Sequence, residues 1–168
     1  MLRSIYLLAI SFLFCSNLVM AQNVPFEKSL FKDRKDEYKA AKEALDNGDK
    51  EYGHGFRDAA LDYYLVAQKF NPNNAELNLK IGRCMLSSLN RERKESLGYL
   101  EKAYKLDANI DKKIHLYLGQ SNHLNENWDA AISEYQKEKQ MITGSAHPHE
   151  IKKLDKRIQE CKNGKELQ

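Results

Sequence analysis

Residues 75–104 read AELNLKIGRCMLSSLNRERKESLGYLEKAY, two helix-length stretches joined by a short polar turn. Gly82 lies in the first stretch, and glycines recur 34 residues before it, at Gly48, and 37 residues after it, at Gly119. Each glycine is followed by a small residue and, four positions later, by a large one: Ala60 with Tyr64, Ser96 with Leu100, and Ala131 with Tyr135. A period near 34 residues is typical of stacked helix–turn–helix units, so the sequence predicts an all-α fold.

Turn residues divide the chain into successive units. A Gly-His-Gly triplet at 53–55 interrupts the first helical pattern, and an Asn-Pro-Asn-Asn run at 71–74 ends the second, since proline cannot continue a helix and asparagine favours turns. We expect a lead-in segment at 22–35, three helix pairs within 36–146, and a capping helix and tail at 147–168. The pairs span about 36–72, 75–108 and 110–143, with helices at 36–52, 56–70, 75–89, 95–106, 110–124 and 128–141.

The last expected helix opens at Pro148, because the first helical position is one that proline favours. Its apolar side chains recur at helical spacing, and the opposite face is charged. The apolar stripe consists of Ile151, Leu154, Ile158 and Cys161. We expect Asn163 and Gly164 to end this helix, since both residue types are favoured just after a helix. A terminal helix with a polar outer face is what a helical stack needs at its end.

The first 21 residues have the features of a secretory signal peptide. Arg3 supplies a positive start, residues 5–14 are apolar apart from Ser11, and the Val-Met-Ala run at 19–21 resembles a cleavage site. The sequence therefore predicts an exported protein, with an uncleaved membrane anchor as the alternative. A bacterial lipid anchor on Cys15 would need a small residue before it, where Phe14 stands.

The net charge of +3 is too small to indicate nucleic-acid binding, and acidic and basic residues alternate as on a solvated helix face. An exported protein could join Cys84 and Cys161 in a disulfide. However, Cys84 is expected in the middle of a helix and Cys161 at the end of the last one, whereas a disulfide needs Cα atoms within about 7 Å. The pattern favours two packed thiols.

The repeated residues resemble the tetratricopeptide repeat (TPR), in which a large residue precedes glycine, and a small residue, an aromatic residue, alanine and proline follow. The matching residues are Gly48, Ala60, Tyr64, Ala67 and Pro72; Ile81, Gly82 and Ala103; and Leu118, Gly119, Trp128, Ala131 and Tyr135. The resemblance covers about residues 36–143 and departs at Ser96, Leu100, Ala108 and Glu138. It implies a right-handed α-α superhelix, a TPR solenoid of three helix pairs plus a C-terminal capping helix.

A narrower resemblance rests on the strings NAELNLKIG at 74–82 and IQECKNGK at 158–165. They are similar to the N-terminal TPR module of large envelope proteins of gram-negative bacteria, which continue into a β-propeller and an OmpA-like peptidoglycan-binding domain. Some of those proteins serve type IX secretion or gliding. The resemblance implies a location in the periplasm or at the periplasmic face of the outer membrane. The present sequence ends at Gln168, where the propeller would begin, so peptidoglycan binding is not carried over.

In the TPR family, the first helix of each pair lines an inner groove that binds proteins. The residues that this resemblance directs into the groove are Lys42, Asp49, Leu79, Arg83, Leu86, Gln120 and His123. Their mixture of aliphatic and polar groups suits an extended segment or a helix. The carboxylate clamp of chaperone-binding repeats is not matched, because Leu45 and Tyr117 stand where that pattern has polar groups.

We therefore expect a non-enzymatic adaptor for protein partners, without a cofactor, metal, nucleic acid or small-molecule substrate, that meets a membrane only as part of a complex. The alternative is a structural spacer within a larger envelope protein. A hydrolase or metalloenzyme is a third hypothesis without a supporting motif. His147 and His149 share one loop, and no cysteine or carboxylate stands beside them at zinc-ligand spacing; the other histidines are His54, His115 and His123.

Overall fold

The computed structural model describes residues 22–88, 93–143 and 148–167, and these are all-α, without a strand. Their α-helices are α1 (Lys35–Gly53), α2 (Arg57–Phe70), α3 (Ala75–Ser87), α4 (Ser96–Leu106), α5 (Ile114–Leu124), α6 (Trp128–Ile142) and α7 (Pro148–Glu166). Short 3-10 helices at Lys28–Phe31 (η1) and Arg93–Glu95 (η2) precede α1 and α4. None of the described helices is both long and apolar enough to cross a membrane. The expected signal peptide at 1–21 lies outside the described residues.

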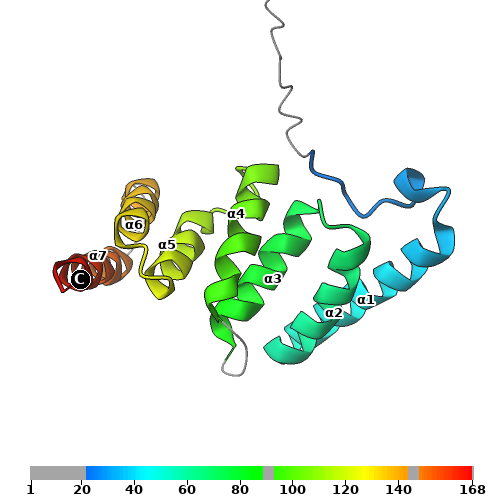
Figure 1. Cartoon of the computed structure of the whole chain (residues 1–168), viewed down its shortest axis with the longest axis horizontal. Helices are drawn as coiled ribbons and strands as arrows, with labels where there is room; N and C mark the ends of the chain where they lie inside the picture. The colour runs from blue at the N-terminus through cyan, green and yellow to red at the C-terminus, as the bar shows by residue number, and fades with distance from the viewer. Residues whose placement is uncertain (1–21, 89–92, 144–147, 168) are drawn as a thin grey trace, which may run out of the picture.

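The helices follow one another in a row, from α1 at one end to α7 at the other (Figure 1). Each helix packs on its neighbours in the chain. The buried apolar side chains form three clusters, the first between α1, α2 and α3, the second between α3, α4 and α5, and the third mainly between α6 and α7. The core is thus distributed along the row and has no single centre.

The recurrent glycines are points of close helix contact, as the sequence predicts. A Cβ atom at Gly48 would lie 2.6 Å from the Tyr64 ring, and one at Gly119 would lie 2.5 Å from the Tyr135 ring. At Gly82 the obstructing side chain is Leu100, also at 2.6 Å. Only glycine lets the two helices of each pair approach this closely, so the period of the glycines is the period of the helix pairs.

The predicted start of α5 is wrong by four residues, because the helix begins at Ile114 and not at residue 110. The preceding turn is held by two aspartates. Asp107 Oδ1 accepts a hydrogen bond from the N–H of Asn109 at 2.9 Å, and Asp111 Oδ1 accepts one from the N–H of Lys113 at 2.7 Å. Such local side-chain bonds offer the backbone an alternative to the helix.

The predicted end of α7 at Asn163 and Gly164 is also wrong, since the helix continues to Glu166. A Cβ atom at Gly164 would lie 2.9 Å from the indole of Trp128, the first residue of α6. This glycine therefore marks a further close contact between helices. The helix start at Pro148 and its buried residues Leu154, Ile158 and Cys161 agree with the expected apolar stripe.

The lead-in segment is bound to the turn between α2 and α3. The carbonyl of Val24 accepts hydrogen bonds from the side-chain amides of Asn71 and Asn74, each at 2.9 Å. Asn23 Oδ1 accepts the N–H of Ala75 at 2.9 Å, at the start of α3. These hydrogen bonds fix the segment against the turn between α2 and α3.

The two cysteines of the described residues are free and buried, which confirms the expectation of packed thiols. Cys84 belongs to the first core cluster and Cys161 to the third. Burial raises the pKa of the Cys84 thiol to about 11, so this thiol remains protonated at neutral pH.

Candidate functional site

Two adjoining hollows are lined mainly by α1, α3, α5 and α7, the first helix of each pair and the capping helix, with single residues from α2, η2 and α6. The proximal hollow measures about 240 Å³ and the distal hollow about 370 Å³. The proximal hollow is lined by Tyr52, Arg57, Arg83, Leu86, Ser87, Tyr117 and Gln120. The distal hollow is lined by Leu86, Arg93, Gln120, His123, Leu124, Tyr135, Arg157 and Glu160. Because they share two residues, we treat them together as the inner groove.

Arginine and tyrosine side chains organise the proximal hollow. Arg83 Nη2 donates to the Tyr52 hydroxyl at 2.8 Å, and its guanidinium carbon lies 5.3 Å from the centroid of the Tyr117 ring. Arg57 lies over Tyr52 at 3.5 Å and donates to its carbonyl at 2.9 Å. Asp111 Oδ2 stands 3.6 Å from Arg83 Nη1. Cation–π contacts hold both guanidinium groups in place, and the ion pair with Asp111 adds to the hold on Arg83.

A second arginine–tyrosine contact organises the distal hollow. The guanidinium carbon of Arg157 lies 5.7 Å from the centroid of the Tyr135 ring. With its amide oxygen turned toward α7, Gln120 accepts hydrogen bonds from Arg157 Nη1 and Nη2 at 2.5 and 3.1 Å. The His123 ring meets Trp128 edge to face, with centroids 5.5 Å apart. Side chains of α5, α6 and α7 therefore meet at this end of the groove.

The groove combines positive charge with neutral phenols. Four arginines line its two hollows, against the single carboxylate of Glu160. Burial raises the pKa of Tyr117 even though Arg83 acts in the opposite direction, and burial raises the pKa of Tyr135 to about 12. Both hydroxyls thus stay protonated at neutral pH. Arginine and tyrosine are the residue types enriched at the energetic centres of protein interfaces.

Four of the residues that the sequence directed into the groove line it: Arg83, Leu86, Gln120 and His123. The other three line neither hollow. Lys42 pairs with Asp46 on α1, and Leu79 is only 5% exposed within the second core cluster.

Asp49 is the third of these residues, and it serves to join helices. It accepts a hydrogen bond from the Tyr64 hydroxyl at 2.7 Å and one from Lys80 Nζ at 2.8 Å. These bonds link α1 to α2 and to α3. Of the seven predicted residues, the packing of the helices thus leaves four at the hollows and places three elsewhere.

Sequence reasoning missed Tyr52 and Arg157, which contribute to the groove from α1 and α7. A signal for Tyr52 was present, because it follows Gly48 by four residues, as Leu86 follows Gly82 and His123 follows Gly119. No such register exists for Arg157, since α7 lies outside the repeats. Only the packing of α7 on α6 brings that arginine to the groove.

The described residues contain no cluster of three or more His, Cys, Asp or Glu side chains placed to hold a metal ion. His115 Nδ1 instead contacts Glu134 Oε2 at 2.6 Å, across α5 and α6. His147 lies outside the described residues. No protein-family model matches the chain, and no curated protein is significantly similar to it.

Proposed function

We infer that the chain is an exported TPR-type adaptor of the bacterial envelope, whose three helix pairs and capping helix form a right-handed superhelix with a protein-binding groove. The single observation that carries this proposal is the inner groove, with arginine and tyrosine side chains presented from successive repeats. The glycine-determined helix contacts support the repeat assignment. The proposal involves no catalysis, cofactor or metal.

The groove suits an acidic or carbonyl-rich partner segment. Guanidinium groups recognise carboxylates and backbone carbonyls through several N–H donors, and phenol rings add apolar contact area. A segment laid along the groove would pass Arg83 and Tyr117 in the proximal hollow and Arg157 in the distal one. A few such anchors dominate the affinity of most interfaces.

The proposal is tested by recovery of partners from envelope extracts with three forms of the chain. These are the natural chain, the groove variant Arg83→Glu/His123→Glu, and the control variant Lys102→Glu/Lys105→Glu, whose positions on α4 line neither hollow. We expect the groove variant to lose a partner that the control retains. Circular dichroism must first show equal helix content, because Arg83 also contacts Tyr52.

Equal recovery of every partner by all three forms would contradict binding through the groove. The spacer hypothesis would then remain. In that hypothesis the row of helices joins other parts of an envelope protein, and no groove residue is needed to bind a partner. A spacer is the second candidate for that reason.

A further inference from the structure

One buried carboxylate breaks the repeat pattern without any role in the inner groove. Glu138 stands on α6 at the position where the first two helix pairs have Ala67 and Ala103, both 0% exposed. Glu138 is itself only 4% exposed, and its Oε2 atom has no hydrogen-bond partner among the described residues. A buried acceptor without a donor costs on the order of 1–3 kcal/mol, so its presence calls for a reason.

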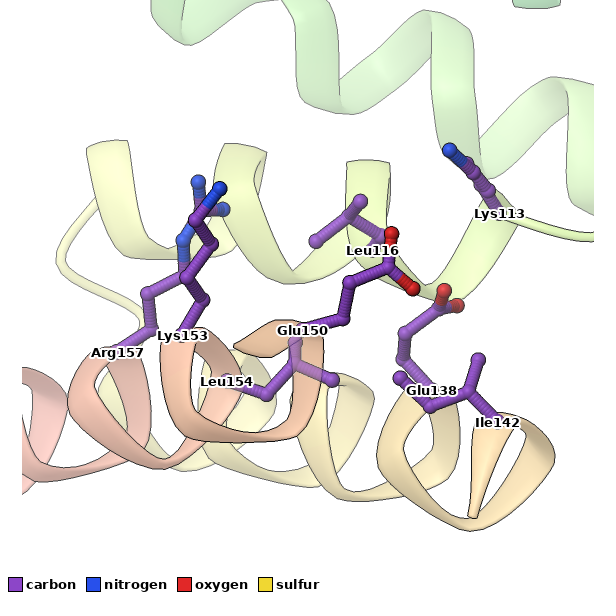
Figure 2. Close-up of a pocket in the computed structure, with 8 residues that line it drawn as sticks. All are labelled: Lys113, Leu116, Glu138, Ile142, Glu150, Lys153, Leu154 and Arg157. Atoms are coloured by element: carbon purple, nitrogen blue, oxygen red, sulfur yellow. The ribbon is translucent and has the colours of Figure 1, made fainter. Parts of the chain in front are cut away.

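Glu138 lies at a further pocket of about 200 Å³, which shares Arg157 with the distal hollow and which we name the Glu138 pocket. The pocket lies between the first turn of α5, the last turns of α6 and the first turns of α7 (Figure 2). Leu116, Ile142 and Leu154 supply its apolar wall. Pockets for drug-sized ligands measure roughly 300–1,000 Å³, so this one suits a more compact molecule.

The charges around this pocket are separated. Figure 2 shows the carboxyl groups of Glu138 and Glu150 toward one side, and the nitrogens of Lys153 and Arg157 toward the other. Lys113, which directly precedes α5, lies at the rim near the carboxyl groups. None of these cations forms an ion pair with Glu138 within the described part of the chain. The pocket therefore offers an anionic and a cationic subsite beside an apolar wall.

The Oε2 atom of Glu138 is available to accept a hydrogen bond from a charged group, because no described residue donates to it. Burial raises the pKa of its carboxyl, whereas the backbone of Leu116 and the charges of His115 and Lys113 act in the opposite direction. Asp111 adds to the upward shift. His115 is itself held by Glu134 at 2.6 Å, so it is not the missing partner. A ligand ammonium would supply the donor that Oε2 lacks.

We propose that the Glu138 pocket binds a free aliphatic α-amino acid, with its ammonium group on Glu138, its carboxylate toward Lys153 and Arg157, and its side chain against Leu116, Ile142 and Leu154. A zwitterion matches both subsites at once. A simple amine would leave Lys153 without a counter-ion, since Arg157 already donates to Gln120, and a simple carboxylate would leave Glu138 Oε2 without a donor. The protein acts on this ligand only by binding it.

The test uses the full chain and three small molecules that carry the same isobutyl group. L-leucine is the zwitterion, 3-methylbutylamine lacks the carboxylate, and 4-methylpentanoate lacks the ammonium. Binding is followed by NMR of the methyl groups of Leu116, Ile142 and Leu154, with those of Leu86 in the inner groove as an internal reference. We expect L-leucine to shift only the pocket methyl groups, with a dissociation constant of about 1 mM or below, and each analogue to bind at least about tenfold more weakly.

Two variants and a control assign the site. Glu138→Gln keeps the shape of the side chain, and Glu138→Ala restores the residue type of the first two repeats. We expect both to weaken L-leucine binding by about tenfold or more, which corresponds to roughly 1.4 kcal/mol. Glu101→Gln on α4 removes one exposed negative charge elsewhere and should leave binding unchanged. If Glu138→Ala changes the packing of side chains around the pocket, the binding measured for Glu138→Gln decides the test.

Three results would overturn the proposal. The pocket methyl groups could remain unshifted up to about 10 mM L-leucine, roughly ten times the expected dissociation constant. Either analogue could bind as tightly as L-leucine, or both Glu138 variants could bind it as the natural chain does. None of these outcomes bears on the inner groove, whose partner test uses other residues and another readout.

Discussion

At the scale of single residues, the second helix pair solves the same packing problem with different side chains. Leu100 fills the space that a tyrosine fills in the other two pairs. Ser96 replaces alanine and is fully buried, and its hydroxyl lies 2.6 Å from that of Ser121 on α5. The Ser96 hydroxyl also donates to the carbonyl of Arg93 at 2.7 Å, so it has hydrogen-bond partners in the core and the substitution costs little.

The glycine contacts predict opposite effects for two alanine substitutions. Gly119→Ala places a Cβ atom 2.5 Å from Tyr135 and should reduce the free energy of unfolding by about 1–3 kcal/mol. Gly98→Ala on α4 meets nothing within 4 Å and should increase that free energy by about 0.4–1 kcal/mol. Urea unfolding followed by circular dichroism measures both. Equal effects of the two substitutions would rule out the steric explanation.

Glu138 predicts a pH dependence of stability. Because burial raises its pKa in the folded state, its contribution to stability is complete below the pKa of the unfolded chain and is lost as pH rises through the folded pKa. Glu138→Gln lacks this titration. Its stability relative to the natural chain should therefore rise as the pH increases from about 4 through the folded pKa, by about 1.4 kcal/mol per unit of difference between the two pKa values. Urea unfolding across this range checks it, and a constant difference would contradict it.

At the scale of helices, the spacing of the repeated residues predicted where most helices start. The start of α5 is determined instead by hydrogen bonds within the preceding turn. The starts of α2, α3, α4 and α6 lie within one residue of the expected ones. The late start of α5 depends on Asp107 and Asp111, whose side chains bond the backbone only when the turn has formed. The burial of Leu79 and the presence of Arg157 in the groove likewise depend on contacts between helices, which no single-helix pattern contains.

The start of α3 predicts a measurable cap. Asn74 Oδ1 accepts the N–H of Leu77 at 2.8 Å, and its amide donates to Val24 at 2.9 Å. Asn74→Ala should therefore cost at least about 1 kcal/mol of stability. It should also speed amide exchange in the lead-in segment, as mass spectrometry can measure. Asn73→Ala is the control, expected within about 0.5 kcal/mol of the natural chain. Similar effects from both variants would show that the cap contributes nothing specific.

At the scale of the whole molecule, α1 and α7 lie at opposite ends of the row (Figure 1). The three core clusters are arranged along it, and α7 covers Tyr135 and Ala131 at one end. In such an array, stability is approximately a sum of terms from each unit and from the contacts between neighbours. Local opening should therefore differ from one end to the other.

A substitution in the last cluster tests this local character. Leu154→Ala removes a side chain that is 4% exposed and should destabilise the end of the row by about 2–5 kcal/mol. Hydrogen exchange should become faster in α6 and α7, whereas α1 to α3 should keep their protection. Equal loss of protection along the whole chain would indicate one cooperative unit.

The Gly164 contact extends the design of the repeats beyond the repeats themselves. Trp128 meets a bare backbone on α7, much as Tyr64 meets one on α1. The same kind of contact, an aromatic ring against a glycine backbone, thus joins α6 to α7, a helix that carries no repeat sequence. A chain built this way can gain or lose a hairpin during evolution, provided that whichever helix follows still offers a residue without a side chain at the meeting point.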